Sequence, residues 1–174
     1  MENDRQHIAL LSRPGCTGVE LGVARGDLTR RFLDLGHFSE FHAVDKWNDQ
    51  HSVQEYERVV EKLKDYEELT VWRAEVKQWL KTIPDGSFGF VYIDCYAHTG
   101  QDEGLILEAA WPKLAVGGLF SGDDYDKSAW PRTFERVNSF AESVGRHVSV
   151  YDDHLSNDMD QSGFDGSPSW YFSK

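Results

Sequence analysis

Short apolar segments alternate with longer amphipathic segments along the chain. The apolar segments predict strands over residues 17–21, 41–44, 69–72, 88–93, 118–121, 148–151 and 169–172. Between them, apolar residues recur at helical spacing, which predicts helices over about 27–35, 53–66, 76–80, 103–114 and 128–144. The chain therefore alternates strand and helix from residue 17 to the strand predicted at 148–151.

Strands joined through helices imply right-handed crossovers and a largely parallel sheet. Residues 88–93 are apolar at nearly every position, as in a central strand that is covered on both faces. The last two predicted strands have no helix between them, so we expect the final strand to run antiparallel. The prediction is a Rossmann-like, doubly wound α/β domain with a seven-stranded, mostly parallel sheet and helices on both faces.

Length and composition agree with one globular domain. The chain has 174 residues, 40% of them hydrophobic and 28% charged, so we expect a single domain over 1–174 with a short N-terminal arm at 1–16. No apolar run approaches the roughly 20 residues of a membrane span, and the polar start does not resemble a signal peptide. The two cysteines lie far apart in the sequence. We expect a soluble cytoplasmic protein without membrane contact.

The net charge argues against nucleic acid as a partner. With 18 Lys and Arg against 30 Asp and Glu, the formal net charge is −12. A polyanion would be repelled unless basic residues gathered on one face, and here they are interleaved with acids. The expected partner is a small molecule.

Acidic residues follow the predicted strands. In a doubly wound sheet, ligands bind beyond the carboxyl ends of the strands, where the strand order reverses. The acids at these positions are Glu20, Asp45, Glu75, Asp94, Asp123 and Asp124. Asp45 or Glu75 alone is better explained as a solvated loop residue, but the recurrence of acids at the strand ends predicts a ligand site.

A glycine turn, Gly22 to Gly26, joins the first strand to the first helix. The dinucleotide fingerprint would need its second and third small residues at Ala24 and Asp27, and Asp27 would put a carboxylate against a pyrophosphate. A nicotinamide cofactor is thus disfavoured, and an ordinary strand-to-helix turn is the simpler alternative. With Asp45, which could accept hydrogen bonds from both ribose hydroxyls, the turn favours a nucleoside site.

Taken together, these segments resemble a class I S-adenosylmethionine-dependent methyltransferase. The resemblance lies in residues 19–26, 43–47, 91–100 and 111–125, with 168–172 similar to the last antiparallel strand of that fold. Within the class, the chain is most similar to small O-methyltransferases with Asp-Asp-Tyr after the fifth strand.

The resemblance implies roles for particular residues. Glu20, Gly22 and Gly26 would hold the amino-acid part of the cofactor, and Asp45 its ribose. Trp47 and Glu75 would border the adenine, with Asp94 beside the sulfonium. The full set of expected cofactor-binding residues is Glu20, Gly22, Val23, Ala24, Gly26, Thr29, Asp45, Lys46, Trp47, Ala74, Glu75 and Asp94.

Some related sugar and antibiotic O-methyltransferases bind a divalent metal at positions that match Asp94, Asp123 and Asp124. Three carboxylates in one partly dry cleft would repel one another until a proton or a cation is taken up. An all-oxygen site suits Mg²⁺, Mn²⁺ or Ca²⁺. The alternative is that Asp123 or Asp124 caps the following helix.

His98, four residues beyond Asp94, is the candidate catalytic base, acting beside Asp94. An imidazole that titrates near neutral pH can take the proton of an attacking hydroxyl. One more residue separates Asp94 from His98 than in some relatives. Cys95 has no cationic neighbour in sequence and is expected to be a buried small side chain rather than a nucleophile.

The expected activity is methyl transfer from S-adenosylmethionine to an oxygen of a small molecule, such as a sugar or another hydroxylated metabolite, with a divalent metal assisting. The alternative is a non-catalytic S-adenosylmethionine-binding or nucleoside-binding domain, or a methyltransferase-like subunit that needs a partner. About 16 residues precede the first strand, so a lid could come from a second copy in a homodimer or from another protein. The acceptor itself is left open, because its pocket is formed by variable loops.

Overall fold

The computed structural model describes residues 5–48, 51–96, 102–151 and 167–174. Within them lies one sheet in the order β3-β2-β1-β4-β5-β7-β6. Its strands are β1 (Thr17–Leu21), β2 (Glu40–Asp45), β3 (Leu69–Arg73), β4 (Phe88–Ile93), β5 (Leu114–Gly122), β6 (Ser149–Tyr151) and β7 (Ser169–Ser173). Strands β1 to β5 pair in parallel, whereas β7 is antiparallel to both β5 and β6. The predicted sheet is confirmed.

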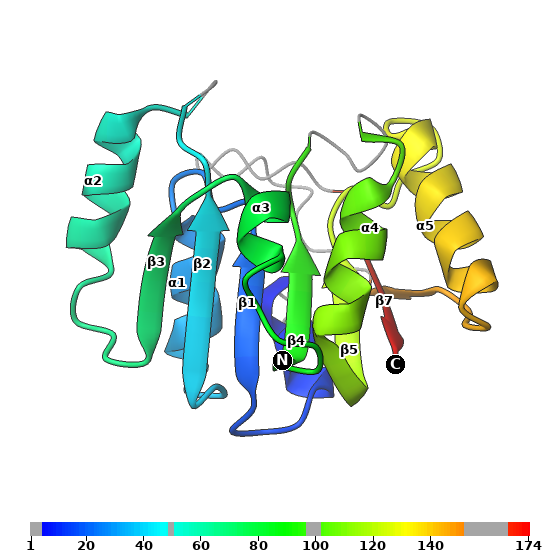
Figure 1. Ribbon diagram of the computed structural model, residues 1–174, viewed down its shortest axis with the longest axis horizontal. Helices are drawn as coiled ribbons and strands as arrows, with labels where there is room; N and C mark the ends of the chain where they lie inside the picture. The colour runs from blue at the N-terminus through cyan, green and yellow to red at the C-terminus, as the bar shows by residue number, and fades with distance from the viewer. Residues whose placement is uncertain (1–4, 49–50, 97–101, 152–166) are drawn as a thin grey trace.

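Helices cover both faces of this sheet (Figure 1). They are the 3₁₀ helix η1 (Arg5–Leu11), α1 (Asp27–Asp34), α2 (Val53–Lys62), α3 (Val76–Leu80), α4 (Leu105–Ala110), the 3₁₀ turn η3 (Trp111–Lys113) and α5 (Pro131–Ser143). The packing assigns η1, α1 and α2 to one face and α3, α4 and α5 to the other.

Alternate residues of the central strand β4 separate the two halves of the core. Val91 and Ile93 pack under α3, α4 and α5, while Phe90 and Tyr92 pack under α1 and η1. All four side chains are at most 3% exposed. Because neighbouring strand residues point to opposite faces, an unbroken apolar run is what a doubly covered strand requires.

The helix boundaries differ from the predictions where local chemistry stops or delays a helix. α2 begins with a capping box formed by Ser52 and Glu55 but ends at Lys62, short of the predicted 66. α4 begins only after Gly104, which has a left-handed backbone. α5 begins at Pro131, because the Asp126 carboxylate first accepts hydrogen bonds from the amides of Ser128 and Ala129 in a separate turn.

The predicted N-terminal arm contains the helix η1. Its Ile8 and Ala9 have no exposed surface and pack with Leu28 and Phe32 of α1. This segment is thus part of the core. No helix among the described residues combines the length and apolar character needed to cross a membrane.

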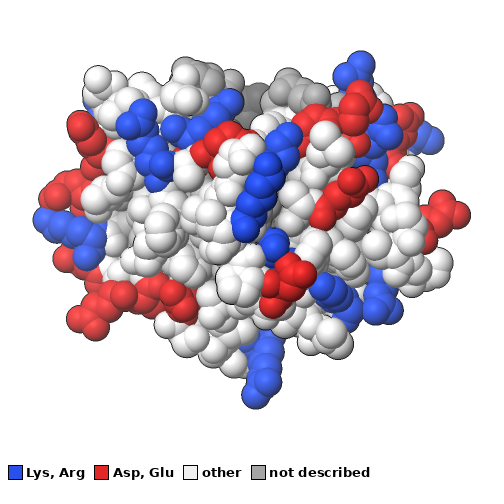
Figure 2. Space-filling view, in the orientation of Figure 1, with Lys and Arg blue, Asp and Glu red and all other residues white. Residues whose placement is uncertain are grey.

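Charged side chains of both signs are spread over the face shown in Figure 2, with basic and acidic residues close together. On the described part of this face no basic patch forms. This distribution agrees with the interleaving of charges in the sequence.

Candidate active site

The carboxyl ends of β1 and β4 meet where the strand order reverses. The amide of Asp94 donates to the carbonyl of Leu21 at 2.8 Å. Gly22 has a φ of 96°, and a Cβ there would lie 1.9 Å from the Asp94 carbonyl oxygen. Only glycine allows this approach, so Gly22 joins the glycine turn directly to the segment that carries Asp94.

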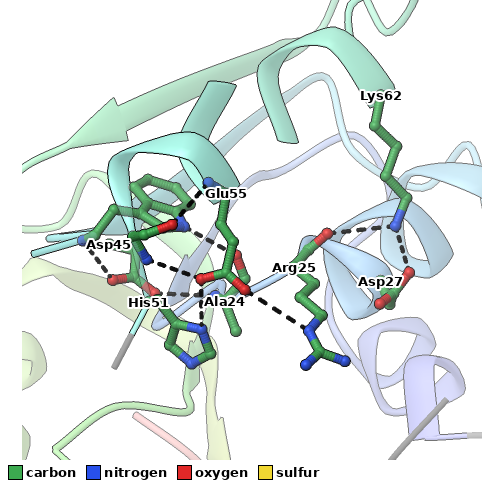
Figure 3. Close-up of polar contacts among 9 residues, drawn as sticks. Ala24, Arg25, Asp27, Asp45, His51, Glu55 and Lys62 are labelled. Atoms are coloured by element: carbon green, nitrogen blue, oxygen red, sulfur yellow. Dashed lines mark hydrogen bonds and ion pairs between the residues drawn. The ribbon is translucent and has the colours of Figure 1, made fainter. Parts of the chain in front are cut away.

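Asp45, at the end of β2, holds the glycine turn in place (Figure 3). Its Oδ2 accepts hydrogen bonds from the amides of Val23 and Ala24, both at 2.9 Å, and its Oδ1 accepts from the amide of Trp47 at 3.1 Å. A carboxylate has about four lone-pair positions. Asp45 therefore shapes the turn and keeps limited capacity to accept further hydrogen bonds.

Trp47 supports the same turn. Its indole Nε1 donates to the carbonyl of Ala24 at 2.9 Å, and its ring lies 5.1 Å from that of Tyr56. The side chain has no exposed surface. In this conformation Trp47 is a buried support for the turn and does not present its ring to a ligand, while the neighbouring Lys46 is half-buried.

Glu20, in β1, is a buried acid that accepts a hydrogen bond from one side chain among the described residues. It is 1% exposed, and the hydroxyl of Thr29 donates to it. Burial raises the pKa of Glu20 well above its usual range, and the nearby Asp94 and Asp45 carboxylates raise it further. Gly26 lies between Glu20 and α1 in the chain, and a Cβ there would be 3.1 Å from Val59. A cationic group at this site would offset the cost of the buried charge.

The outer side of the glycine turn carries surface ion pairs (Figure 3). Lys62 pairs with Asp27 and also donates to the carbonyl of Arg25 at 3.3 Å. Asp27 is the acid whose position argued against a dinucleotide cofactor. Glu55 lies 3.3 Å from His51 and 3.9 Å from the largely exposed Arg25. These pairs link α2 to the turn from the outside.

Glu75, at the end of β3, caps α3 by accepting from the amide of Gln78 at 2.8 Å. The hydroxyl of Tyr96 donates to its other carboxylate oxygen, and Lys77 lies 4.4 Å from the centre of the Tyr96 ring. Tyr96 has a φ of 59°, which is unusual for a bulky residue. The half-buried Ala74 precedes this group, and its amide donates to the carbonyl of Asp45 at 2.8 Å. Sequence reasoning missed Tyr96, because Glu75 follows a different strand, β3.

Asp94, Asp123 and Asp124 come together as predicted. One carboxylate oxygen of each lies within 4.8 Å of the others. Asp123 and Asp124 are 7% and 6% exposed, whereas Asp94 is exposed. Neither Asp123 nor Asp124 caps α5, whose N-cap is Trp130. The capping alternative is wrong, and the three acids form what we call the acid cluster.

Arg5 reaches the acid cluster from η1. Its guanidinium pairs with Oδ2 of Asp123 and donates to the carbonyl of Ser167 at 3.1 Å. Burial raises the pKa of Asp123 well above its usual range; Arg5 opposes this shift, and Asp94 adds to it. Sequence reasoning missed Arg5, since it lies 118 positions from Asp123 in the sequence and no motif marks it.

The acid cluster fits a divalent cation. All the metal-ligand atoms that it offers are carboxylate oxygens, which Mg²⁺, Mn²⁺ and Ca²⁺ prefer. The buried Oδ1 of Asp123 has no hydrogen-bond partner among the described residues. His98 lies outside the described residues. Burial raises the pKa of the Cys95 thiol well above its usual range, which agrees with the expectation that it is not a nucleophile.

Comparison with known proteins decides the family. The family model described as "Methyltransferase domain" matches residues 19–125, from β1 to the Asp-Asp-Tyr segment. The chain belongs to this methyltransferase domain family. The predicted methyltransferase class is confirmed at this level. No match was found among the curated proteins.

Solved structures show the same fold. Spermidine synthase from Thermotoga maritima is 15% identical with a TM-score of 0.71, and the match covers 99% of this chain and 59% of that chain. For the N-methyltransferase NodS from Bradyrhizobium japonicum WM9 the identity is 16%, the TM-score 0.64, and the coverage 98% and 94%. For precorrin-6y C5,15-methyltransferase from Geobacter metallireducens GS-15 these values are 14%, 0.66, 95% and 83%.

Several of the matching solved structures are longer proteins. This methyltransferase domain spans 59% of the length of the Thermotoga maritima spermidine synthase, and 44% and 57% of the lengths of two other matching structures. At these low identities the likeness establishes the Rossmann-like methyltransferase fold and not a shared reaction.

Proposed function

We propose that this domain transfers a methyl group from S-adenosylmethionine to a hydroxyl oxygen of a small molecule, and that a divalent cation on the acid cluster assists. The observation that carries the proposal is the convergence of Asp94, Asp123 and Asp124 within 4.8 Å beside the glycine turn. The family match supports methyl transfer. NodS, which shares the fold, was solved in complex with S-adenosyl-L-homocysteine, which supports the donor.

The donor site would be formed by the residues around the glycine turn. Glu20 would pair with the ammonium group of the amino-acid part, for which a buried carboxylate is a suitable partner. Asp45 would use its remaining acceptor capacity for a ribose hydroxyl while it keeps the turn in shape. Glu75 and Tyr96 would border the adenine, and Asp94 would lie beside the sulfonium.

The acceptor would be held at the acid cluster. A bound Mg²⁺ would lower the pKa of the acceptor hydroxyl, which is why the all-oxygen cluster favours oxygen over nitrogen or carbon as the methylated atom. The chain's own contribution is then to hold the hydroxyl in line with the methyl group and to exclude water. His98 would take the proton. With a formal net charge of −12, we expect a small hydroxylated metabolite as the acceptor rather than nucleic acid.

Two measurements test the proposal. S-adenosylhomocysteine should bind in calorimetry, and methyl transfer to hydroxylated acceptors should be lost in EDTA and restored by Mg²⁺. Asp124→Asn should reduce turnover by roughly 10- to 100-fold because it removes one charged ligand. The control is Asp85→Asn, which alters an exposed aspartate paired with Lys113 on the turn before β4 and should not change turnover.

The donor, the metal and the choice of oxygen can each fail separately. Absence of S-adenosylhomocysteine binding would remove the donor assignment. Turnover that persists in chelator and in Asp124→Asn would remove the metal. Methylation of amines in place of hydroxyls would overturn the choice of oxygen.

A further inference from the structure

We propose that Arg5 is a positioning residue for the metal site. It holds one oxygen of Asp123 so that the other faces a divalent cation. The inference rests on the proposed cation at the acid cluster and goes beyond it, because it makes η1 part of that site.

The contacts of Asp123 divide between its two oxygens. Oδ2 is paired with the Arg5 guanidinium. Oδ1 is buried and has no hydrogen-bond partner among the described residues. A buried acceptor without a donor is destabilising, and a partner for Oδ1 would remove this cost. A cation shared with Asp94 and Asp124 would be that partner.

Arg5 is itself held from several sides. It is 6% exposed, and its second nitrogen donates to the Ser167 carbonyl at 3.1 Å. The hydroxyl of Ser167 accepts from the Trp130 indole at 3.2 Å. The helix η1 is anchored through Ile8 and Ala9, which have no exposed surface. The guanidinium is therefore fixed before any ligand binds.

The charges agree with a cation bound beside Arg5. The three carboxylates carry −3 when ionised, and Arg5 reduces this to −2. A divalent cation then neutralises the cluster. Without Arg5 the same ion would leave a net charge of −1 in a largely buried place, and Asp123 could rotate away from it.

This role predicts an effect of opposite sign from simple repulsion. If Arg5 acted only through its positive charge, its removal would strengthen the binding of another cation. If Arg5 positions Asp123, its removal weakens binding, because groups that orient metal ligands typically contribute about 10- to 100-fold in affinity. Cation affinity therefore distinguishes the two roles.

The experiment is a titration of the full chain with Mn²⁺, without methyl donor or acceptor, in which free Mn²⁺ is measured by electron paramagnetic resonance. We expect Arg5→Met to weaken Mn²⁺ binding by roughly tenfold or more. Arg5→Lys keeps the charge but loses the planar guanidinium that reaches Asp123 and Ser167 together. Its Mn²⁺ affinity should therefore fall by less than that of Arg5→Met. The matched control is Arg136→Met, which removes the partly exposed pair with Glu103 and should leave the affinity unchanged.

Circular dichroism during heating shows whether each variant is folded. If Arg5→Met does not fold, Arg5→Lys decides, and an affinity equal to that of the wild type then overturns the proposal. Equal or tighter Mn²⁺ binding by a folded Arg5→Met also overturns it. So does a wild type that binds no Mn²⁺ while Arg5→Met does, since Arg5 would then replace the metal.

Failure of the proposed function gives a different pattern. If neither the wild type nor any variant binds Mn²⁺, the metal site is wrong and the role of Arg5 falls with it. Binding of S-adenosylhomocysteine, measured in the same samples, then still reports whether the donor assignment holds.

Discussion

Asp45 ends β2 and Asp123 follows β5, and the two acids are almost equally buried, at 8% and 7% exposed. Asp45 accepts three hydrogen bonds from main-chain amides of its own and the neighbouring loop. Asp123 is paired with a distant guanidinium and keeps one oxygen without a donor. The first acid is satisfied before any ligand arrives. The second, in our proposal, is completed by a cation.

Glu20 lies beside the glycine turn but resembles Asp123 in its energetics. Burial raises the pKa of both groups. Among the described residues, the side chain of Thr29 donates to Glu20 and that of Arg5 to Asp123. The edge of the sheet thus contains a structural acid, Asp45, and buried acids that we propose are completed by ligands.

The largest effect is expected at Gly22, where the glycine turn held by Asp45 meets the segment that carries Asp94 of the acid cluster. In Gly22→Ala the new Cβ would lie 1.9 Å from the Asp94 carbonyl. Together with the positive φ, this should cost about 3 kcal/mol or more in the free energy of unfolding. Urea unfolding measures the change. Gly36→Ala, with a φ of 58° and nothing within 4 Å of the Cβ, is the control for backbone strain alone; equal losses in both would show that the close approach is unimportant.

Removal of the structural acid should have the next largest effect. Asp45→Ala leaves the amides of Val23, Ala24 and Trp47 without their acceptor, and we expect a loss of about 2–3 kcal/mol in the free energy of unfolding. Asp45→Asn keeps one carbonyl oxygen and should lose less. Thermal unfolding without ligand checks this, and an unchanged midpoint for Asp45→Ala would show that water replaces the carboxylate.

Glu20→Gln should stabilise the unliganded protein while it weakens ligand binding. Because the pKa of Glu20 is raised in the folded state, its contribution to stability is present below the unfolded pKa of about 4.3 and is lost as the pH rises through the folded pKa. The advantage of the Gln variant should therefore grow with pH and reach a midpoint roughly 2–4 °C higher near neutrality.

Unfolding of the Glu20→Gln variant and the wild type between pH 5 and 8 tests this difference. Calorimetry should show S-adenosylhomocysteine binding weakened by roughly 10- to 150-fold, since a charged hydrogen bond contributes about 1.5–3 kcal/mol. A destabilised variant with unchanged ligand affinity would instead make Glu20 a structural acid like Asp45.

The smallest effect is expected at the outer ion pair of the glycine turn. Lys62→Met removes the pair with Asp27 and the contact with the Arg25 carbonyl, both partly exposed. Such pairs contribute at most about 1 kcal/mol, so the unfolding midpoint should fall by no more than roughly 4 °C. High salt should remove most of the difference. A larger loss would mean that Lys62 fixes the turn as Asp45 does.

Most of the fold could be predicted because it depends on local patterns. The alternation of Val91 and Ile93 with Phe90 and Tyr92 required a strand covered on both faces, and the structure has one. Helix ends were less predictable. α2 stops at Lys62 although its apolar spacing continues, and the turn at Asp126 delays α5.

The candidate site was predicted in part. Asp94, Asp123 and Asp124 could be placed together, because parallel strands end at one edge. Three features could not be predicted, since each depends on which oxygen or ring face a side chain presents. They are the structural role of Asp45, the burial of Trp47 and the contact of Tyr96 with Glu75.

By itself, the sequence determined the succession of strands and helices along the chain, the glycine turn and the acids near the strand ends, because periodicity and spacing are carried by neighbouring residues. Only the tertiary structure decided that Arg5 lies beside Asp123 and leaves Oδ1 without a donor. That contact joins two residues 118 positions apart. It exists because the packing of η1 against α1 brings the beginning of the chain to the carboxyl end of β5.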